Sequence, residues 1–293
     1  MVAAALLISQ FVHHLSTSIL FGGALFPLYG FASPATDIRR ATWLRLLLLN
    51  AAFLALISGI SWFVLSAAEM SGTLAILADT TIIFDIFRNT IFGWVWVFRL
   101  VLALGLVLLL LLHKQVTAQR NYAALIGSLI LLASIAWTGQ PGSDDSVAAP
   151  VRAFHLVAAG VWVGALFVFS RLAVPAVWRL RHDDLLVLHH ALEQFSGVGS
   201  VVVAILLFTG LFLLALPNTS STYDRVLYVK LAMFVAMLVL AAANRFWLTP
   251  QLSMALDSME GLSDTVSTLR ISLLAETALA TLVYVAVAWL ESL

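Results

Sequence analysis

Long apolar segments recur along the chain at lengths that suit membrane helices. A bilayer core needs about 20 apolar residues per helix. Eight stretches meet this requirement, near residues 6–30, 43–67, 91–113, 121–139, 150–173, 197–217, 226–248 and 270–290. They leave no room for a soluble catalytic domain, and the sequence holds no Walker loop, GxGxxG, HExxH or GxSxG motif. The pattern predicts an all-α membrane protein with eight transmembrane helices that is not an enzyme.

Composition supports this prediction. The chain is 62% apolar and 10% charged, whereas a soluble domain carries about 25% charged residues. The first apolar run lacks a positively charged start and is too long for the core of a signal peptide, so we expect it to remain as a helix. Cysteine is absent, which excludes a thiolate ligand for any metal.

The basic residues are distributed unevenly between the predicted loops. One side of the bundle collects Arg39, Arg40, Arg45, Lys114, Arg120, Arg171, Arg179, Arg181, Arg245 and Arg270. The other side has Arg88, Arg152 and Arg225. The positive-inside rule then predicts an N-out, C-out protein with the basic loops in the cytoplasm. In a bacterial inner membrane, the outer side is the periplasm.

One phrase occurs twice in the apolar sequence. Residues 12–26 read VHHLSTSILFGGALF and residues 153–167 read AFHLVAAGVWVGALF. His14 aligns with His155, and each is followed nine residues later by Gly-Ala-Leu-Phe. A polar side chain repeated at one depth in two membrane helices is costly in lipid and indicates a function.

Two further pairs extend this repeat along the chain. Ser58-Gly59 corresponds to Thr209-Gly210, and Arg99 corresponds to Lys230. An even number of helices per unit gives both units the same orientation, so the predicted fold is two parallel four-helix repeats. The predicted parts are a first repeat over 1–140, a periplasmic connection over 141–149 and a second repeat over 150–293.

His14 and His155 are the first candidates for a metal site. Both are predicted at roughly 10 Å below the periplasmic surface, and we expect them to approach within roughly 10 Å of each other across the repeat axis. Imidazole suits copper, zinc or haem iron. Alternatively, each ring donates to a backbone carbonyl or to a hydroxyl such as that of Ser18 and joins helices. The adjacent His13 points about 100° away on a helix and is a weaker candidate.

Methionine offers a second type of copper ligand. Met70 follows Glu69 at the predicted periplasmic end of the second helix, where its thioether could receive a cuprous ion. Met233 and Met237 are four residues apart and share a helix face. Ordinary core packing is the expected role of this second pair.

Three charged residues lie farther inside the predicted helices than the basic residues assigned to the loops. Arg99 and Lys230 either extend to the lipid headgroups or face inward to pair with an acid or an anion. Glu276 is the one acid well inside a predicted helix. It is interpreted either as a proton or cation relay or as a structural acceptor bonded to Asn244 or Thr277.

Two loops have their own patterns. Residues 69–90 are expected to hold a short interfacial helix. Residues 178–195 alternate charged and apolar residues and predict an amphipathic surface helix. Its histidines, His182, His189 and His190, are expected on a solvated face.

At these motifs the chain resembles the copper resistance protein D family (CopD/PcoD) over essentially its whole length. The similar phrases are FVHHLSTSILFGGALF at 11–26, EMSG at 69–72, TIFGWVWVFR at 90–99, FHLVAAGVWVGALF at 154–167, TYDRVLYVKLAMFVAMLVLAAANRFWLTPQL at 222–252 and LRISLLAE at 269–276. The resemblance implies an eight-helix inner-membrane protein of copper homeostasis. It also implies copper movement from the periplasm inward and a periplasmic CopC-type copper-binding partner.

The chain departs from that family at two positions. Family members often carry Gly-His-Ala after the fourth helix, where this chain has Gly139-Gln140-Pro141. Some also carry a histidine or an acid three residues before the fifth-helix histidine, where this chain has Arg152. The chain therefore offers fewer imidazoles for collecting an ion outside the membrane.

The leading hypothesis is a copper permease or importer that holds Cu⁺ at His14 and His155, with lipid as its surroundings and no nucleic-acid partner. A b-type haem protein for electron transfer is an alternative, because two histidines in a helical bundle can ligate haem iron. An assembly or scaffold subunit without transport is a third hypothesis.

Overall fold

The computed structural model describes residues 2–30, 38–71, 88–113, 117–137, 147–174, 182–216 and 221–291, and every regular element in these segments is helical. The helices are α1 (Val2–Leu25), α2 (Ile38–Ser71), α4 (Ile91–Leu112), α5 (Ala118–Ser134), α6 (Ala148–Ala173), α7 (His182–Leu214), α8 (Ser221–Ala243), α9 (Thr249–Ser258) and α10 (Leu262–Glu291). Three short elements continue them, namely η1 (Phe26–Leu28), η4 (Ile135–Trp137) and η6 (Asn244–Leu248).

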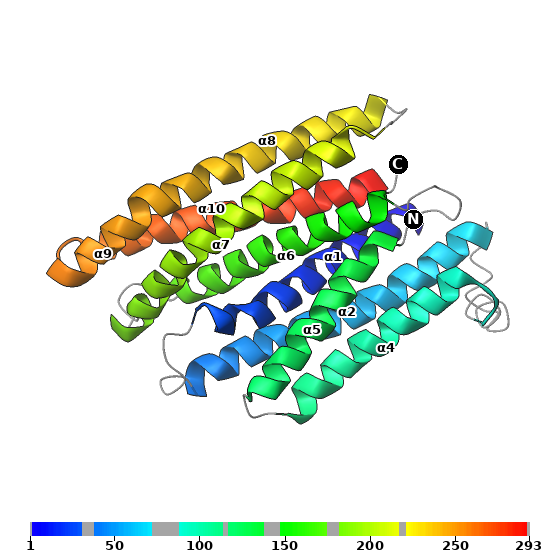
Figure 1. Cartoon of the computed structure of the whole chain (residues 1–293), viewed down its shortest axis with the longest axis horizontal. Coiled ribbons are helices and arrows are strands. Elements are labelled where there is room, and N and C mark those ends of the chain that lie inside the picture. Colours follow the sequence, from blue (N-terminus) through cyan, green and yellow to red (C-terminus); the bar gives the residue numbers. More distant parts are fainter. Residues whose placement is uncertain are drawn as a thin grey trace.

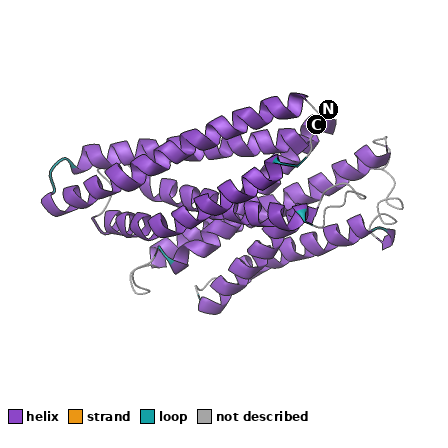
Figure 2. Ribbon diagram, turned by 45° about the horizontal axis from the view of Figure 1, so that its top comes forward, coloured by secondary structure: helices purple, strands orange, loops and turns teal. Residues whose placement is uncertain are grey.

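Eight of the described helical segments are long and apolar enough to cross a membrane, which confirms the predicted number. Figure 1 shows the two ends of the chain at the same end of the bundle, as an even number of crossings requires. Figure 2 shows the same long, roughly aligned helices from a second direction. Two of the helices begin at a threonine: the Oγ1 of Thr90 accepts from the Gly93 N–H at 2.9 Å, and the Oγ1 of Thr117 accepts from the Arg120 N–H at 3.2 Å.

Helices α1 and α6 form the centre of the bundle (Figure 1). They contact each other, and both contact α5 and α10. Helix α2 packs against α1, and α7 packs against α6. We call residues 2–137 the first half and residues 147–291 the second half.

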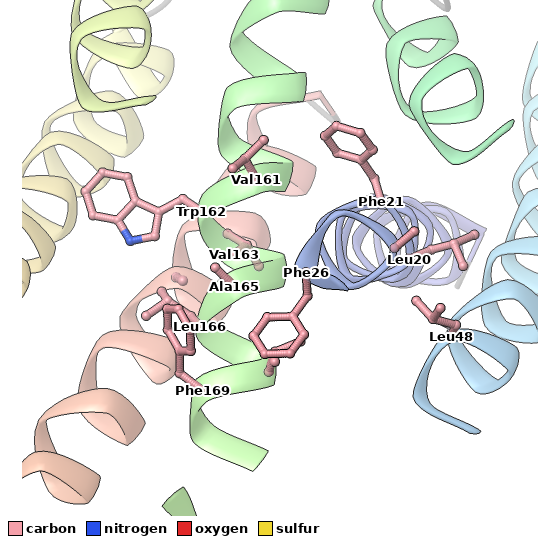
Figure 3. Close-up of a cluster of buried hydrophobic side chains, with 14 of the residues drawn as sticks. Leu20, Phe21, Phe26, Leu48, Val161, Trp162, Val163, Ala165, Leu166 and Phe169 are labelled. Atoms are coloured by element: carbon pink, nitrogen blue, oxygen red, sulfur yellow. The ribbon is translucent and has the colours of Figure 1, made fainter. Parts of the chain in front are cut away.

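Glycines allow α1 and α6 to cross closely. A Cβ atom built on Gly22 would lie 2.6 Å from the Cα of Gly164, and one built on Gly160 would lie 2.5 Å from the side chain of Leu132. Small residues at such crossings increase backbone contact where lipid supplies no hydrophobic driving force. Near the crossing, the ring centre of Phe26 lies 6.4 Å from that of Phe169 on α6, whereas Leu20 points toward Leu48 of α2 (Figure 3).

The helix that begins at Ser221 does not end near residue 248, as the sequence predicted. It continues through η6 into α9 as one span over Arg225–Ser258. Pro250 has no N–H, and its ring would clash with the carbonyl of Phe246 in an ordinary α-helix. The N–H of Thr249 instead bonds to the carbonyl of Asn244, five residues back, so the chain makes a π-helical turn. This wide turn buries the side chain of Asn244.

Two predictions about loops have different outcomes. The amphipathic helix predicted over 178–195 is present from His182, and it continues without a break through the apolar segment to Leu214 as one helix, α7. Its first turns bury Leu185 and Leu188 against the rest of the bundle. The predicted interfacial helix at 69–90 falls mostly on residues 72–87, which lie outside the described part of the chain.

Candidate functional site

His13 is bound on both sides of its ring in the first half. Its Nδ1 lies 2.9 Å from the carbonyl oxygen of Ala55 and 3.3 Å from the hydroxyl of Ser58, both on α2. Its Nε2 lies 3.0 Å from the Nη2 of Arg99 on α4. A guanidinium can only donate, so Nε2 is the acceptor and Nδ1 carries the hydrogen of a neutral ring.

Aromatic rings enclose this pair. The guanidinium carbon of Arg99 lies 4.2 Å from the ring centre of Trp96 and 5.3 Å from that of Trp62, which favours the buried charge through cation–π contacts. Arg99 is only 1% exposed, so it faces inward and does not extend to the headgroups. We call His13, Ser58, Trp62, Trp96 and Arg99 the His13 cluster.

His14 faces a different neighbour from His13. Its Nδ1 donates to the carbonyl of Gln10, one turn earlier in α1, at 2.8 Å, and its ring lies 5.4 Å from that of Trp62. With Nδ1 protonated, Nε2 carries the lone pair of the neutral ring. Ser18, which we expected as a possible partner of these histidines, instead bonds to the hydroxyl of Tyr284 at 2.6 Å.

His155 in the second half repeats the arrangement of His13. Its Nδ1 lies 2.8 Å from the hydroxyl oxygen of Thr209 on α7. That hydroxyl gives its own hydrogen to the carbonyl of Ile205 at 2.6 Å, so His155 is the donor and its Nε2 carries the lone pair. Lys230 on α8 lies close enough to interact electrostatically with the ring.

The two halves therefore contain matching groups of a histidine, a hydroxyl and a basic residue. Each hydroxyl precedes a glycine that leaves room for the histidine ring. A Cβ atom on Gly59 would lie 3.2 Å from the Cε1 of His13, and one on Gly210 would lie 3.6 Å from that of His155.

The structural correspondence between the two halves is shifted by one residue from the predicted alignment of His14 with His155. In its hydrogen bond to a hydroxyl on the next helix and its basic neighbour, His13 is the counterpart of His155. Gly22, rather than Gly23, meets Gly164 at the helix crossing. Both observations agree with the same shift of one residue. The described hydrogen bonds place His14 and His155 with different neighbours, and the prediction that they share one ion stays a prediction.

His155 lines a cavity of about 230 Å³ between α6, α7, α8 and α10. The side chains of Trp162, Lys230, Met237 and Tyr284 also line this space, which we call the His155 cavity. Met237 thus brings a thioether to the same cavity as an imidazole. The sequence suggested ordinary core packing for Met237, because residue spacing alone does not reveal which helix face borders a cavity.

A larger cavity of about 880 Å³ lies farther along the second half, and we call it the Glu276 cavity. The Oε1 of Glu276 accepts from the indole N–H of Trp162 at 2.8 Å, and its Oε2 accepts from the amide of Asn244 at 2.9 Å. The predicted bond between Glu276 and Asn244 is therefore present, whereas Thr277 bonds to Ser170 at 2.8 Å.

Trp162 lines both cavities. Figure 3 shows its indole projecting from α6 on the side away from α1. Its position between the two spaces was missed by the sequence analysis, since Trp162 reads as one more apolar residue of the repeated phrase.

Smaller residues in the second half explain why the His155 cavity occurs there. Trp62 stands four residues after Ser58, whereas Leu213 stands four residues after Thr209. Trp96 stands three residues before Arg99, whereas Leu227 stands three residues before Lys230. Both leucines line the His155 cavity. Two indoles that fill the first half are thus replaced by leucines.

The remaining predicted residues are placed as follows. Glu69 is exposed near the end of α2, and the side chain of Met70 lies outside the described part of the chain. His189 was expected on a solvated face, but it is partly buried, lines the Glu276 cavity and lies 3.6 Å from Glu193. No group of three or more histidine, aspartate or glutamate side chains in the described segments is arranged to hold a metal. A copper site would therefore need other ligands, such as the thioether of Met237.

Comparisons with known proteins give consistent matches. The family model described as "Copper resistance protein D-like, N-terminal domain" matches residues 1–139, and the one described as "Copper resistance protein D" matches residues 189–290. Copper resistance protein D of Pseudomonas syringae pv. tomato is 30% identical over 298 residues, covering 97% of this chain and 94% of that protein. Inner membrane protein YebZ of Escherichia coli (strain K12) is 28% identical over 262 residues, covering 83% of this chain and 84% of that protein. No solved structure matches the chain.

The second relative and the eight apolar helices together settle the location of the chain. It is a multi-pass protein of the inner membrane.

Proposed function

Because the chain belongs to the copper resistance protein D family, we propose that this copper-related membrane protein is a permease that carries copper from the periplasm toward the cytoplasm. The observation that carries the proposal is the His155 cavity, which places an imidazole and a thioether in one space between membrane helices.

The ligand types favour cuprous copper. Imidazole nitrogen and thioether sulfur are soft or borderline donors that accept Cu⁺. Both are neutral, so an empty site leaves no unpaired carboxylate in the membrane. The bond from His155 to Thr209 fixes the ring tautomer with Nε2 free of hydrogen, as metal-binding histidines require. Lys230 borders the same cavity, and its positive charge would keep the affinity low enough for release.

His14 is proposed as the second imidazole. Its bond to the Gln10 carbonyl gives it the same tautomer as His155. Met70 and Glu69 are proposed at the entrance to the path. His13 is assigned to holding the first half together, because its Nε2 accepts from Arg99 and could bind copper only if the guanidinium moved away.

The proposed path runs through the second half. With N-out, C-out topology from the positive-inside rule, the His155 cavity lies on the periplasmic side and the Glu276 cavity on the cytoplasmic side. The proposed architecture is two parallel four-helix repeats, related by an axis at the α1–α6 crossing. The matching groups around His13 and His155 support this repeat. A CopC-type protein that delivers copper would meet the periplasmic end.

Methionine substitution tests the copper path. Met237→Leu keeps the volume of the side chain but removes the sulfur, so it should lower copper uptake into proteoliposomes at least about tenfold while leaving folding intact. Met233→Leu is the matched control, because Met233 lies on the same helix outside the lining of the His155 cavity. Equal uptake by the two variants would contradict the proposed role of Met237.

The two other hypotheses give different results. A haem protein would show a Soret band in the visible spectrum of the purified protein, whereas a copper(I) permease would be colourless. A scaffold subunit would show no copper uptake in any variant.

A further inference from the structure

Glu276 is a buried acid whose recorded partners are both neutral. It is 2% exposed, and its two oxygens accept from Trp162 and Asn244. An ionised carboxylate is costly to bury without a counter-charge. No ion pair joins Glu276 to a basic side chain in the described segments. The carboxylate therefore needs either a proton or a bound cation to balance its charge.

Asn244 supplies an independent sign of a ligand. Its side chain is only 7% exposed, and its amide nitrogen donates to Glu276. Its amide oxygen is buried and has no hydrogen-bond partner in the described part of the chain. An unsatisfied buried acceptor costs about 1–3 kcal/mol. A cation or a hydrogen-bond donor that binds the amide oxygen of Asn244 would remove this cost. The π-helical turn at Asn244–Leu248 gives Asn244 this position, and such turns are frequent at functional sites.

We propose that Glu276 and Asn244 form a binding site for a monovalent cation, a proton or Na⁺, at the wall of the Glu276 cavity. Carboxylate and amide oxygens are hard ligands that suit such ions and disfavour cuprous copper. One positive charge balances one carboxylate. The cavity of about 880 Å³ that both residues line gives the ion room to enter.

The other charged or titratable groups around this cavity are few. Helix α7 contributes His189 and Glu193, and η6 contributes Arg245. Arg245 is exposed and donates to the carbonyl of Ser196 at 3.1 Å and to the hydroxyl of Ser200. Helix α6 presents Trp162 and no charge, and the residues of α8 that line the cavity are apolar. Glu276 is therefore the buried group on which an entering cation would act.

Trp162 connects this site to copper movement, a step that rests on the proposed function. Its indole lines both cavities and donates to the carboxylate. A cation that binds the carboxylate reduces the negative charge that holds the indole N–H. The ring is then freer to turn and to join the His155 cavity to the Glu276 cavity. The cation would thus control the passage between the two spaces.

Infrared difference spectroscopy of the purified full-length protein without copper tests the site directly. In the wild-type protein, a protonated carboxyl band should appear as the pH is lowered, and Glu276→Gln should remove it completely. Glu193→Gln is the matched control, since Glu193 lines the same cavity but is exposed, and this variant should retain the band. Trp162→Phe removes one donor to the carboxylate and should let the band persist to higher pH.

Exchange of choline for Na⁺ at constant ionic strength then identifies the ion. Loss of the band on adding Na⁺ would show that Na⁺ and the proton compete for the site. An unchanged band would assign the site to the proton alone. A spectrum in which neither pH nor Na⁺ changes any band removed by Glu276→Gln would overturn the proposal. Because copper is absent throughout, this result does not depend on whether the chain transports copper.

Discussion

The His13 cluster and the region around His155 contain the same three kinds of polar side chain, but the apolar residues around them differ. In both, a histidine donates to a hydroxyl on the next helix and lies near a basic residue. In the first half, Trp62 and Trp96 fill the space around these polar side chains, and α2 packs against α4. In the second half no contact of comparable extent joins α7 to α8 within the described segments, and two cavities are found there.

Under the proposed function, this difference separates a structural histidine from a copper-binding one. A histidine whose Nε2 accepts from a buried arginine, as in the His13 cluster, holds helices together and repels a cation. A histidine beside an open space and a thioether can receive one. On this account, matching polar residues in the two halves have different roles because the apolar residues around them differ.

The largest expected effect on stability comes from removing an indole of the first half. Trp96→Ala should lower the free energy of unfolding by about 3–5 kcal/mol, because Trp96 is buried and contacts Arg99, Trp62 and Phe63. Leu227→Ala, at the corresponding position, should cost only about 1 kcal/mol, since Leu227 is only partly buried and borders a cavity, so its side chain has fewer contacts to lose. Denaturation of the purified variants in detergent measures both values. Similar losses would contradict the contrast between a filled and an open half.

The next largest effect on stability is expected from His13→Ala, which should destabilise the protein more than His155→Ala does. His13→Ala should cost about 2–3 kcal/mol, because it removes one buried acceptor of the Arg99 guanidinium together with the bond to the Ala55 carbonyl. His155→Ala should cost about 1 kcal/mol, since Thr209 keeps its bond to the Ile205 carbonyl. The same denaturation experiment measures both losses. If His155→Ala proved the more destabilising, the structural role would belong to the second half instead.

The smallest effect on stability is expected from filling the open half. Leu227→Trp places an indole where the first half has Trp96 and should change the free energy of unfolding by less than about 1.5 kcal/mol, because the His155 cavity can accept part of the ring. Copper uptake by proteoliposomes should nevertheless fall to background. A folded Leu227→Trp protein with full uptake would show that copper does not pass through this cavity.

Much of the fold could be predicted from the sequence. Apolar segments of membrane length predicted the eight helices. The close approach of α1 and α6 at Gly22 and Gly164 lies within the two copies of the repeated phrase, but it was not predicted from them. Helix ends were less accurate: the amphipathic helix predicted over 178–195 begins four residues later, at His182, and is one continuous helix with the apolar segment that follows. The π-helical turn before Pro250 was also missed, because a proline more often marks the end of a helix.

The candidate site was predicted only in part. The repeated phrase identified His14 and His155, but two similar apolar sequences align almost as well when shifted by one residue. The contacts of His13 with Ser58 and Arg99 depend on how α1 is rotated, which the phrase does not fix. The cavities depend on the side-chain volumes of three helices at once, so Met237 and Trp162 could not be recognised from spacing.

The central claim is that copper is held in the second half by His155, with His14 as a second imidazole. The most direct measurement is the copper content per chain, by elemental analysis, of the wild-type protein and of His13→Ala, His14→Ala, His155→Ala and the His14→Ala/His155→Ala double variant. We predict that His155→Ala loses most of its copper and that folded His13→Ala retains it. If the two imidazoles share one ion, His14→Ala should lose as much as His155→Ala, and the double variant should lose little more. If folded His155→Ala kept the full copper content of the wild-type protein, the account would be contradicted.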